Sequence, residues 1–579
     1  MAWDGKERSE VKRDPANYRR ICETVLGATI APIDFTRLQR TNLAMDPEAT
    51  DTVYEAAVAD NTPFTIVQAP SGAGKSRIVE RRVSKLMESG VCPAEILVLA
   101  NSLTRSSQLS QQTPGILAMP FNEFTQGLFD ANIPMVQSAG RHVVSAALKL
   151  NAYDPDAPEC FRGKTADDLV LALQVDDPLE RWIRLTELSN QKTDEVVELV
   201  SRAGYACHEI KSTVAQNRVY KFQQDPFEAK AILVDGVHNM PLPVLCAVLE
   251  YAYRFRSSLF MTGEPKECIC EFNMAYAEAI NHLTTRPGVR INRLSDRSSL
   301  PEDIRAVLTA NNDVSLPSEH VMLDYQVWKD PEQRDPMIAA AVEAAVPDIE
   351  RNVRDKKQTL ILARSQRDAA VIKTALRKRA PWLTSDEILV DLTRAEQGEA
   401  VRSRCLMDWY PYLHATYRDG LSMRQLFAEL YNMFSADVRK LQDNARLRRT
   451  YKRTRDGLLD WANAHFARFN GYDAVVALDD AIRLMIEMEA EDEQARFQEI
   501  YKAGVKAHAV PVVLSTIHGA INLHSDYVLA VMAQDTGYPD LPLWKVALSR
   551  AKERERIAVI TNDCVKSPYQ LYLLERSRG

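Results

Sequence analysis

One short run constrains the fold of this chain more than any other feature: Ala69-Pro70-Ser71-Gly72-Ala73-Gly74-Lys75-Ser76. It follows a β-prone apolar segment, 64–67, and precedes a helical pattern over 77–89. A strand, a loop ending in Gly-Lys-Ser and a helix form the sequence context of a phosphate-binding loop. We therefore expect an α/β fold that binds a nucleotide here. The alternative is a glycine-rich turn without a ligand.

The residue types of this loop suit the chemistry of phosphate. Small residues such as Ala69, Gly72 and Gly74 allow backbone N–H groups to wrap an anion, and the helix N-terminus adds a favourable dipole. Lys75 can reach the β- and γ-phosphates of a nucleotide, and the Ser76 hydroxyl can ligate Mg²⁺. Ala69 stands where the usual pattern has its first glycine.

Composition excludes several other classes of protein. A length of 579 residues suggests about three or four domains. With a net charge of −7, any nucleic-acid contact must use a local basic surface. The nine cysteines lack Cys-x-x-Cys spacing, which indicates a reducing compartment without disulfides or a zinc site. The sequence has neither a long apolar run nor a signal-peptide pattern. We expect a soluble, intracellular protein of the cytoplasm or a nucleus-like compartment, with no membrane partner.

Eight short β-prone runs punctuate a mostly helical sequence. Helical patterns lie between them, as expected of parallel sheets with crossover helices. The runs form one group before about residue 275 and another after about residue 288, which predicts two α/β domains. The runs are Phe64–Val67, Ile96–Leu99, Ala231–Val234, Leu259–Thr262, Thr359–Ala363, Val512–Ser515, Tyr527–Val531 and Ile557–Thr561.

Each group of strands is interrupted by a gap far longer than a normal crossover connection. We expect a largely helical insertion in each gap, at about 104–228 and at 376–504. The predicted organisation is an N-terminal segment, 1–50, a first α/β domain, 51–275, and a second α/β domain formed by 276–375 and 505–579.

Two further positions carry candidate chemistry. Asp235 ends an apolar strand, and in a phosphate-loop ATPase such an aspartate holds Mg²⁺; a capping aspartate is the alternative. The next residue, where active ATPases of this kind place a water-activating glutamate, is Gly236. Late in the chain, the block 545–553 predicts a helix with Arg550 early in it. Arg550 could reach a phosphate as an arginine finger, or it could belong to a solvated basic face.

Together these motifs resemble the UvrD/Rep family of superfamily 1 helicases, along nearly the whole chain. The family's loop also begins with alanine, and its final Val-Ala-Leu-Thr-Arg-Ala-Lys-Glu motif resembles Val546–Glu553 closely. Its Asp-Glu motif resembles 235–238. Residues 263–272 resemble its Gly-Asp-x-x-Gln-x-Ile-Tyr-x-Phe motif. Residues 295–298, followed by a predicted helix at 303–311, resemble its Asn-Tyr-Arg-Ser motif. Residues 516–524 resemble its Thr-Ile-His-x-x-Lys-Gly-Leu-Glu motif.

The resemblance implies two RecA-like P-loop domains with ATP and Mg²⁺ between them. Lys75, Ser76 and Asp235 would come from the first domain, with Ser76 and Asp235 holding the metal. Arg297 and Arg550 would approach the γ-phosphate from the second. Family members move along single-stranded DNA in the 3′-to-5′ direction and part duplexes, so single-stranded nucleic acid, DNA rather than RNA, is the expected partner. No nuclease motif is evident, so a nuclease or polymerase is a further candidate partner.

The chain departs from the family at several functional positions. Gly236 replaces the catalytic glutamate, Glu267 the γ-phosphate-sensing glutamine and His524 a nucleotide-contacting glutamate. Ile521-Asn522 replaces Lys-Gly, Ala49 lies near the place of the adenine-reading glutamine, and Pro120–Phe124 replaces an early DNA-binding block.

These departures leave three functions open. Losing a general base costs about 10²- to 10⁴-fold in rate, whereas phosphate binding need not suffer. The sequence favours a nucleotide-binding helicase relative with impaired hydrolysis. The alternatives are a fully active 3′-to-5′ helicase, or a non-catalytic scaffold subunit of a nucleic-acid-processing complex. Glu267 could also be a relocated general base that takes over the role Gly236 cannot perform.

The second predicted insertion contains a basic segment, 439–455, with eight Lys and Arg residues and Tyr451 between them. Such a patch could bind phosphates and stack on a base. The alternative is a solvated helix face that pairs with the acidic run 487–493. His208 and His238 are interpreted as local polar residues and not as metal ligands.

Overall fold

The computed structural model describes residues 15–395, except 71, 134, 155, 176, 295–299 and 303–318, single positions between 432 and 499, and residues 502–562, except 508, 522 and 535–540. These residues fall into two compact units. The first lies within Met1–Gly127, Val219–Gln397 and Glu499–Gly579, and the second within Leu128–Arg218 and Gly398–Gln498.

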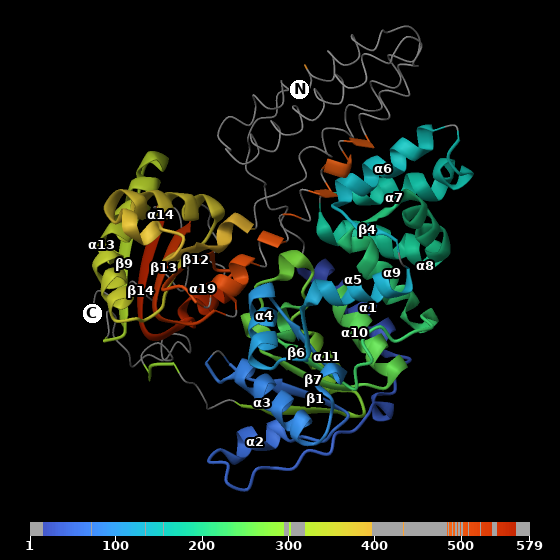
Figure 1. Ribbon diagram of the computed structural model, residues 1–579, viewed down its shortest axis with the longest axis horizontal. Coiled ribbons are helices and arrows are strands. Elements are labelled where there is room, and N and C mark those ends of the chain that lie inside the picture. Colours follow the sequence, from blue (N-terminus) through green and yellow to red (C-terminus); the bar gives the residue numbers. More distant parts are fainter. Residues whose placement is uncertain are drawn as a thin grey trace. The chain divides into compact units, whose positions relative to one another are not determined.

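The first unit contains two six-stranded sheets in which every neighbouring pair of strands is parallel (Figure 1). The strand order of the first sheet is β3-β2-β6-β7-β1-β8. Its strands are β1 (Phe64–Gln68), β2 (Ile96–Ala100), β3 (Leu117–Pro120), β6 (Ala231–Asp235), β7 (Ser258–Gly263) and β8 (Val289–Arg293).

Helices cover this sheet because its central strands are apolar on both faces. Every residue of β2, β6 and β7 is buried. Helix α3 places Ile78, Val79 and Val83 in the same core as β1 and β2. The helices of this part are α1 (Pro15–Ile30), α2 (Thr52–Val58), α3 (Lys75–Glu88), α4 (Leu103–Gln112), α5 (Phe121–Asn132), α10 (Leu242–Phe255) and α11 (Ala279–Thr284).

The second sheet has the order β11-β12-β10-β13-β14-β9. Helices α13 (Arg334–Arg354) and α14 (Gln366–Arg379) contribute to one of its cores. Another core combines side chains of α19 (Leu541–Leu548) with Cys268, Ile269 and Ala275, which follow β7 in the chain. The strands are β9 (Val321–Trp328), β10 (Thr359–Ala363), β11 (Leu389–Asp391), β12 (Val512–Thr516), β13 (Ser525–Gln534) and β14 (Ala551–Asn562).

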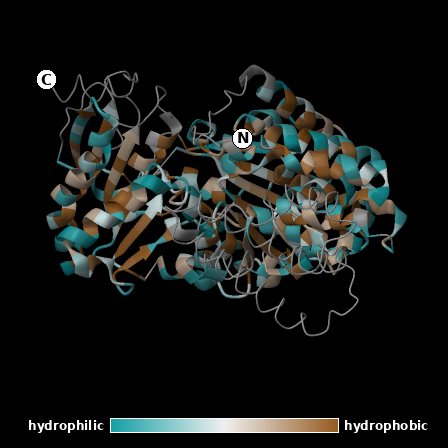
Figure 2. Ribbon diagram, turned by 90° about the horizontal axis from the view of Figure 1, so that it is seen from above, coloured by the Kyte–Doolittle hydropathy of each residue, from teal (hydrophilic) through white to brown (hydrophobic). Residues whose placement is uncertain are grey.

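Hydropathy follows this layering. Figure 2 shows strands coloured mainly as hydrophobic, whereas most helices carry both hydrophobic and hydrophilic residues. Such two-sided helices bury one stripe against a core and expose the other. None of the helices in the described ranges combines the length and apolar character needed to cross a bilayer.

The described part of the second unit is largely helical. Val143, Leu169 and Leu199, from three different helices, share its core. The elements are α6 (Arg141–Tyr153), α7 (Lys164–Gln174), α8 (Pro178–Ala203) and α9 (His208–Arg218), with short strands β4 (Gln137–Ser138) and β5 (Tyr205–Ala206). This helical character fits a helical first insertion, but its predicted bounds, about 104–228, are too wide: the second unit covers only Leu128–Arg218 there, and β3 belongs to the first sheet. Most of the predicted second insertion, 376–504, lies outside the described residues, and β11, inside its predicted start, belongs to the second sheet.

All eight predicted strands are confirmed as β1, β2, β6, β7, β10, β12, β13 and β14. Two further expectations need correction. Strand β8 pairs with β1, so the first sheet extends to Arg293 and past the boundary predicted at 275. Arg550 lies between the end of α19 and the start of β14, so the expected helix with Arg550 in an early turn is wrong.

Candidate functional site

The carboxyl ends of three neighbouring strands meet at one edge of the first sheet. Gln68 of β1 lies opposite Gly263 of β7, and Thr262 of β7 lies opposite Asp235 of β6. Because the strands are parallel, the loops that follow them leave the sheet on the same side, where open α/β sheets bind ligands. The structure thus brings together the loop 69–76, Asp235 and the turn that contains Glu267.

The loop 69–76 has the backbone shape that its glycines allow. Gly72 and Gly74 have φ angles of 78° and 85°, in the left-handed region that favours glycine. The N–H of Ala69 donates to the carbonyl of Gly263 at 3.2 Å, which fixes the loop to β7. Gly74 directly precedes α3, whose first turn leaves N–H groups without partners in the helix. Those groups suit an anion.

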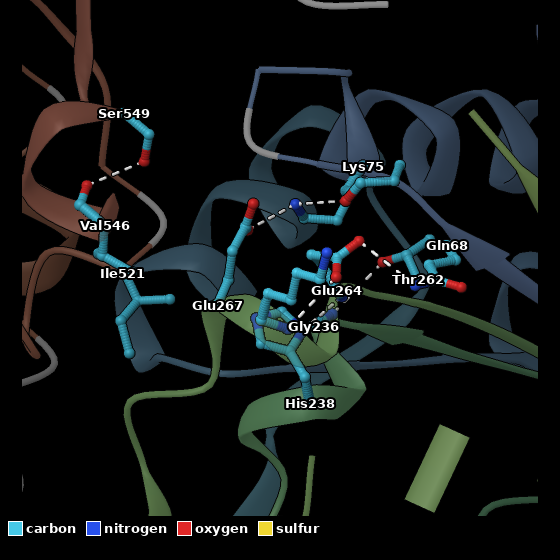
Figure 3. Close-up of polar contacts among 12 residues, drawn as sticks. Gln68, Lys75, Gly236, His238, Thr262, Glu264, Glu267, Ile521, Val546 and Ser549 are labelled. Atoms are coloured by element: carbon cyan, nitrogen blue, oxygen red, sulfur yellow. Dashed lines mark hydrogen bonds and ion pairs between the residues drawn. The ribbon is translucent and has the colours of Figure 1, made fainter. Parts of the chain in front are cut away.

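Lys75 is held on both sides of its ammonium group. Its Nζ atom donates to the Ala69 carbonyl and to Oε2 of Glu267, each at 2.8 Å. Figure 3 shows the Lys75 and Glu267 side chains directed at one another. The carboxylate of Glu267 therefore occupies the position beside Lys75 where an anionic group would bind.

Asp235 is paired with an arginine that the sequence did not single out. Nε of Arg105 lies 3.0 Å from Oδ2 of Asp235, and both side chains are 3% exposed. Nη1 of Arg105 donates to the Glu80 carboxylate at 2.8 Å, and Nη2 to the Ser76 carbonyl at 3.1 Å. Burial by itself lowers the pKa of Arg105, but the carboxylates of Asp235 and Glu80 outweigh it and raise that pKa. The guanidinium is thus fixed as a cation.

This arrangement does not fit a magnesium ion held by Ser76 and Asp235. Mg²⁺ requires oxygen ligands at about 2.0–2.1 Å in a near-octahedral shell. One oxygen of Asp235 binds Arg105, and the other lies 3.4 Å from the Thr262 hydroxyl. A guanidinium within hydrogen-bond distance of the ligand atom also repels a divalent cation.

Gly236, which stands in the place of the expected catalytic glutamate, has a φ angle of 89°. A residue with a Cβ atom is strained at this angle. The N–H of Gly236 donates to the carbonyl of Thr262 at 3.1 Å, so this conformation is fixed to β7.

His238 is buried next to this turn and acts as an acceptor. Its Nδ1 atom accepts a hydrogen bond from the N–H of Glu264 at 3.2 Å, so Nε2 carries the proton of the neutral ring. Burial and the charge of Lys75 lower the pKa of His238 to about 4. His238 therefore fixes the turn that leads to Glu267, in line with its interpretation as a local polar residue.

Arg550 is a buried structural cation in this arrangement, with 6% of its surface exposed. It donates to the carbonyls of Ile521 and Val546 and to the Ser549 hydroxyl. Figure 3 shows Ile521, Val546 and Ser549 close to one another. In this view the Glu267 side chain lies between these residues and Lys75. The charges of Arg550 and Glu267 interact, while burial lowers the pKa of Arg550 to about 10.

Other predicted positions have different outcomes. Arg297, the helix predicted at 303–311, the basic segment 439–455 and Asn522 lie outside the described residues. His524 is exposed. Within Pro120–Phe124, Phe124 is fully buried and stacks on Phe227 at 5.4 Å, so this aromatic ring belongs to the core.

Ala49, predicted near the place of an adenine-reading glutamine, lines a cavity of about 340 Å³ with Tyr54 and Arg77. Arg77 belongs to the first turn of α3, so this cavity lies near the loop 69–76. Alanine has no polar side-chain atom that could read a base edge.

Sequence reasoning missed Arg105 as a residue of this site. The only sequence signal is its place: it stands five residues after the end of β2, whose Ala100 lies opposite Asp235. Comparison with protein-family models and with curated proteins finds no match to this chain.

Proposed function

We propose that this chain is a helicase-like nucleotide-binding protein of the superfamily 1 type, with impaired hydrolysis. It binds the phosphates of ATP at the loop 69–76 and the start of α3. One observation carries this proposal: parallel strands β1, β7 and β6 bring a Gly-Lys-Ser loop, Asp235 and Glu267 to the same sheet edge. A Gly-Lys-Ser loop next to a strand-end aspartate is typical of a phosphate-loop site, whereas Glu267 is a departure from it.

Impaired hydrolysis follows from the residues around the expected attacking water. Gly236 has no side chain to orient water, and its φ angle disfavours a replacement. Glu267 is the remaining candidate base, but its carboxylate is engaged in an ion pair with Lys75 at 2.8 Å. A relocated base at Glu267 therefore requires that the pair open when nucleotide binds.

Single-stranded nucleic acid and a partner enzyme remain expected ligands on the strength of the motif resemblance. The basic segment 439–455 is the candidate contact. The fully active 3′-to-5′ helicase is the main alternative, and the scaffold subunit is favoured if ATP binds without turnover.

Calorimetric titration with ATP tests the proposal. Lys75→Ala removes the cation that meets the phosphates and should abolish binding. Lys230→Ala is the matched control, because Lys230 directly precedes β6 at the opposite edge of the sheet and its side chain is 52% exposed. Equal ATP affinity in the wild type and Lys75→Ala would refute the proposed site.

A further inference from the structure

We propose that Arg105 is a built-in cation of this phosphate site and takes the place expected for Mg²⁺, so that ATP binds here without a divalent metal. The inference rests on the proposed function, since it concerns the same site. It replaces the metal expected from the sequence with a side chain of this protein.

The first support is the position of the guanidinium. Arg105 contacts the carboxylate of Asp235, which was predicted to hold the metal, and the backbone carbonyl of Ser76, whose hydroxyl was the other predicted ligand. It also contacts Glu80 at 2.8 Å and Oε1 of Gln108 at 2.9 Å. These four contacts use four of its five N–H groups and leave one on Nη2, the atom directed at the first turn of α3.

The second support is the local fold, which fixes Arg105 before any ligand arrives. Ser102 caps α4 by accepting a hydrogen bond from the Arg105 N–H at 3.2 Å. Arg105 thus lies in the first turn of α4, directly after β2. Because Ala100 of β2 lies opposite Asp235, this turn places the side chain beside the carboxylate.

The third support is charge. Arg105 lies between two carboxylates, Asp235 and Glu80, and its own side chain is 3% exposed. Removing it would leave Asp235 buried without its partner, which is costly. The guanidinium is also a planar donor that suits phosphate oxygens, and it stays charged at every physiological pH. The guanidinium thus offsets the charge of Asp235 without a metal and reduces the repulsion between that carboxylate and a phosphate.

The test compares ATP binding in excess Mg²⁺ and in excess EDTA. We expect the wild-type dissociation constant to change by less than about threefold, since no metal ligand is lost. Losing one charge-assisted hydrogen bond costs about tenfold or more in affinity. Arg105→Gln should therefore weaken binding by that factor in EDTA and recover it in Mg²⁺, whereas Arg105→Lys should keep the resistance to EDTA. A wild-type affinity that falls tenfold in EDTA would overturn the inference.

A second readout needs no nucleotide and separates this inference from the proposed function. Electron paramagnetic resonance follows Mn²⁺ binding to the full chain. We expect no Mn²⁺ site that depends on Asp235 in the wild type, and a new one in Arg105→Gln that Asp235→Asn removes. A wild-type Mn²⁺ site lost in Asp235→Asn, or no new site in a folded Arg105→Gln chain, would contradict the inference. Absence of ATP binding with an unchanged Mn²⁺ result would refute only the proposed function.

Discussion

The ammonium of Lys75 lies 2.8 Å from the carboxylate of Glu267, and these side chains are only 15% and 10% exposed. The residue best suited to bind a phosphate is therefore already paired with an internal anion. An incoming triphosphate must displace Glu267 or bind against its negative charge. Glu267 thus competes with the ligand expected at this loop.

Glu267→Gln should tighten ATP binding. The variant removes the competing charge but keeps the size of the side chain, and a hydrogen bond to a charged group contributes about 1.5–3 kcal/mol. We expect affinity to rise by about tenfold, measured by calorimetry. If Glu267 is also a relocated general base, residual hydrolysis should vanish in the same variant.

Glu264→Gln is the matched control, because Glu264 begins the same turn but accepts hydrogen bonds from Gln68 and from the N–H of Lys266. It should leave ATP affinity nearly unchanged. Weaker ATP binding in Glu267→Gln would show that Glu267 assists the ligand. Unchanged or faster hydrolysis would exclude the relocated base.

Gly236→Glu restores the residue type expected of an active ATPase, at a backbone cost. The left-handed conformation of position 236 penalises a side chain by about 1–2 kcal/mol. We expect faster ATP turnover together with a lower free energy of unfolding, measured by enzyme-coupled assay and by urea denaturation. Gly236→Asn is the control, since asparagine tolerates this conformation and supplies no base. Equal turnover in the two variants would mean that the missing glutamate does not limit hydrolysis.

His238 should make the protein less stable in acid. Its folded-state pKa of about 4 lies below its ordinary value of 6.5 because of burial and Lys75. The unfolded chain therefore binds the extra proton first, and the stability contribution is lost as pH falls from about 6.5 towards 4. That loss reaches about 3 kcal/mol. His238→Asn should flatten this part of the urea-denaturation profile, and an unchanged profile would assign the acid sensitivity elsewhere.

Glu555 on β14 should be a source of instability. It is 1% exposed, and neither carboxylate oxygen has a hydrogen-bond partner among the described residues. Burial raises the pKa of this carboxyl well above its ordinary value, and Arg550 offsets the shift only in part. An unsatisfied buried polar group costs about 1–3 kcal/mol.

Glu555→Leu should therefore raise the melting temperature, because Glu555 lies opposite Val528 in the sheet. The wild type should lose stability as pH rises above the ordinary glutamate range, since the folded state retains its proton longer. The variant should lack this slope. A lower melting temperature in Glu555→Leu would indicate that the carboxylate stabilises Arg550.

The sequence predicted the interior strands of both sheets and missed the edge strands. The eight predicted strands are the eight interior ones, and the four sheet strands missed, β3, β8, β9 and β11, are the edges. Interior strands of parallel sheets are buried on both faces and read as apolar runs. Edge strands such as β8, with the sequence Val-Arg-Ile-Asn-Arg, keep polar residues that face solvent and hide the pattern.

The sequence predicted the site residues that lie at the ends of strands, but it did not predict the ion pairs that these residues make. Lys75 and Asp235 follow from a loop motif and an apolar run. Their partners, Glu267 and Arg105, lie 192 and 130 positions away along the chain, and local patterns do not encode such pairs. Arg550 was placed in a helix because the run before it is helical, whereas the chain turns there to begin β14.

The rate of ATP hydrolysis by the full chain, with and without single-stranded DNA, distinguishes an impaired ATPase from an active helicase. Enzymes typically turn over about ten times per second, and loss of a general base costs about 10²- to 10⁴-fold. We predict ATP binding with turnover of about 0.1 per second or less, with little stimulation by DNA. A rate of many turnovers per second that single-stranded DNA stimulates would contradict impaired hydrolysis and identify an active motor.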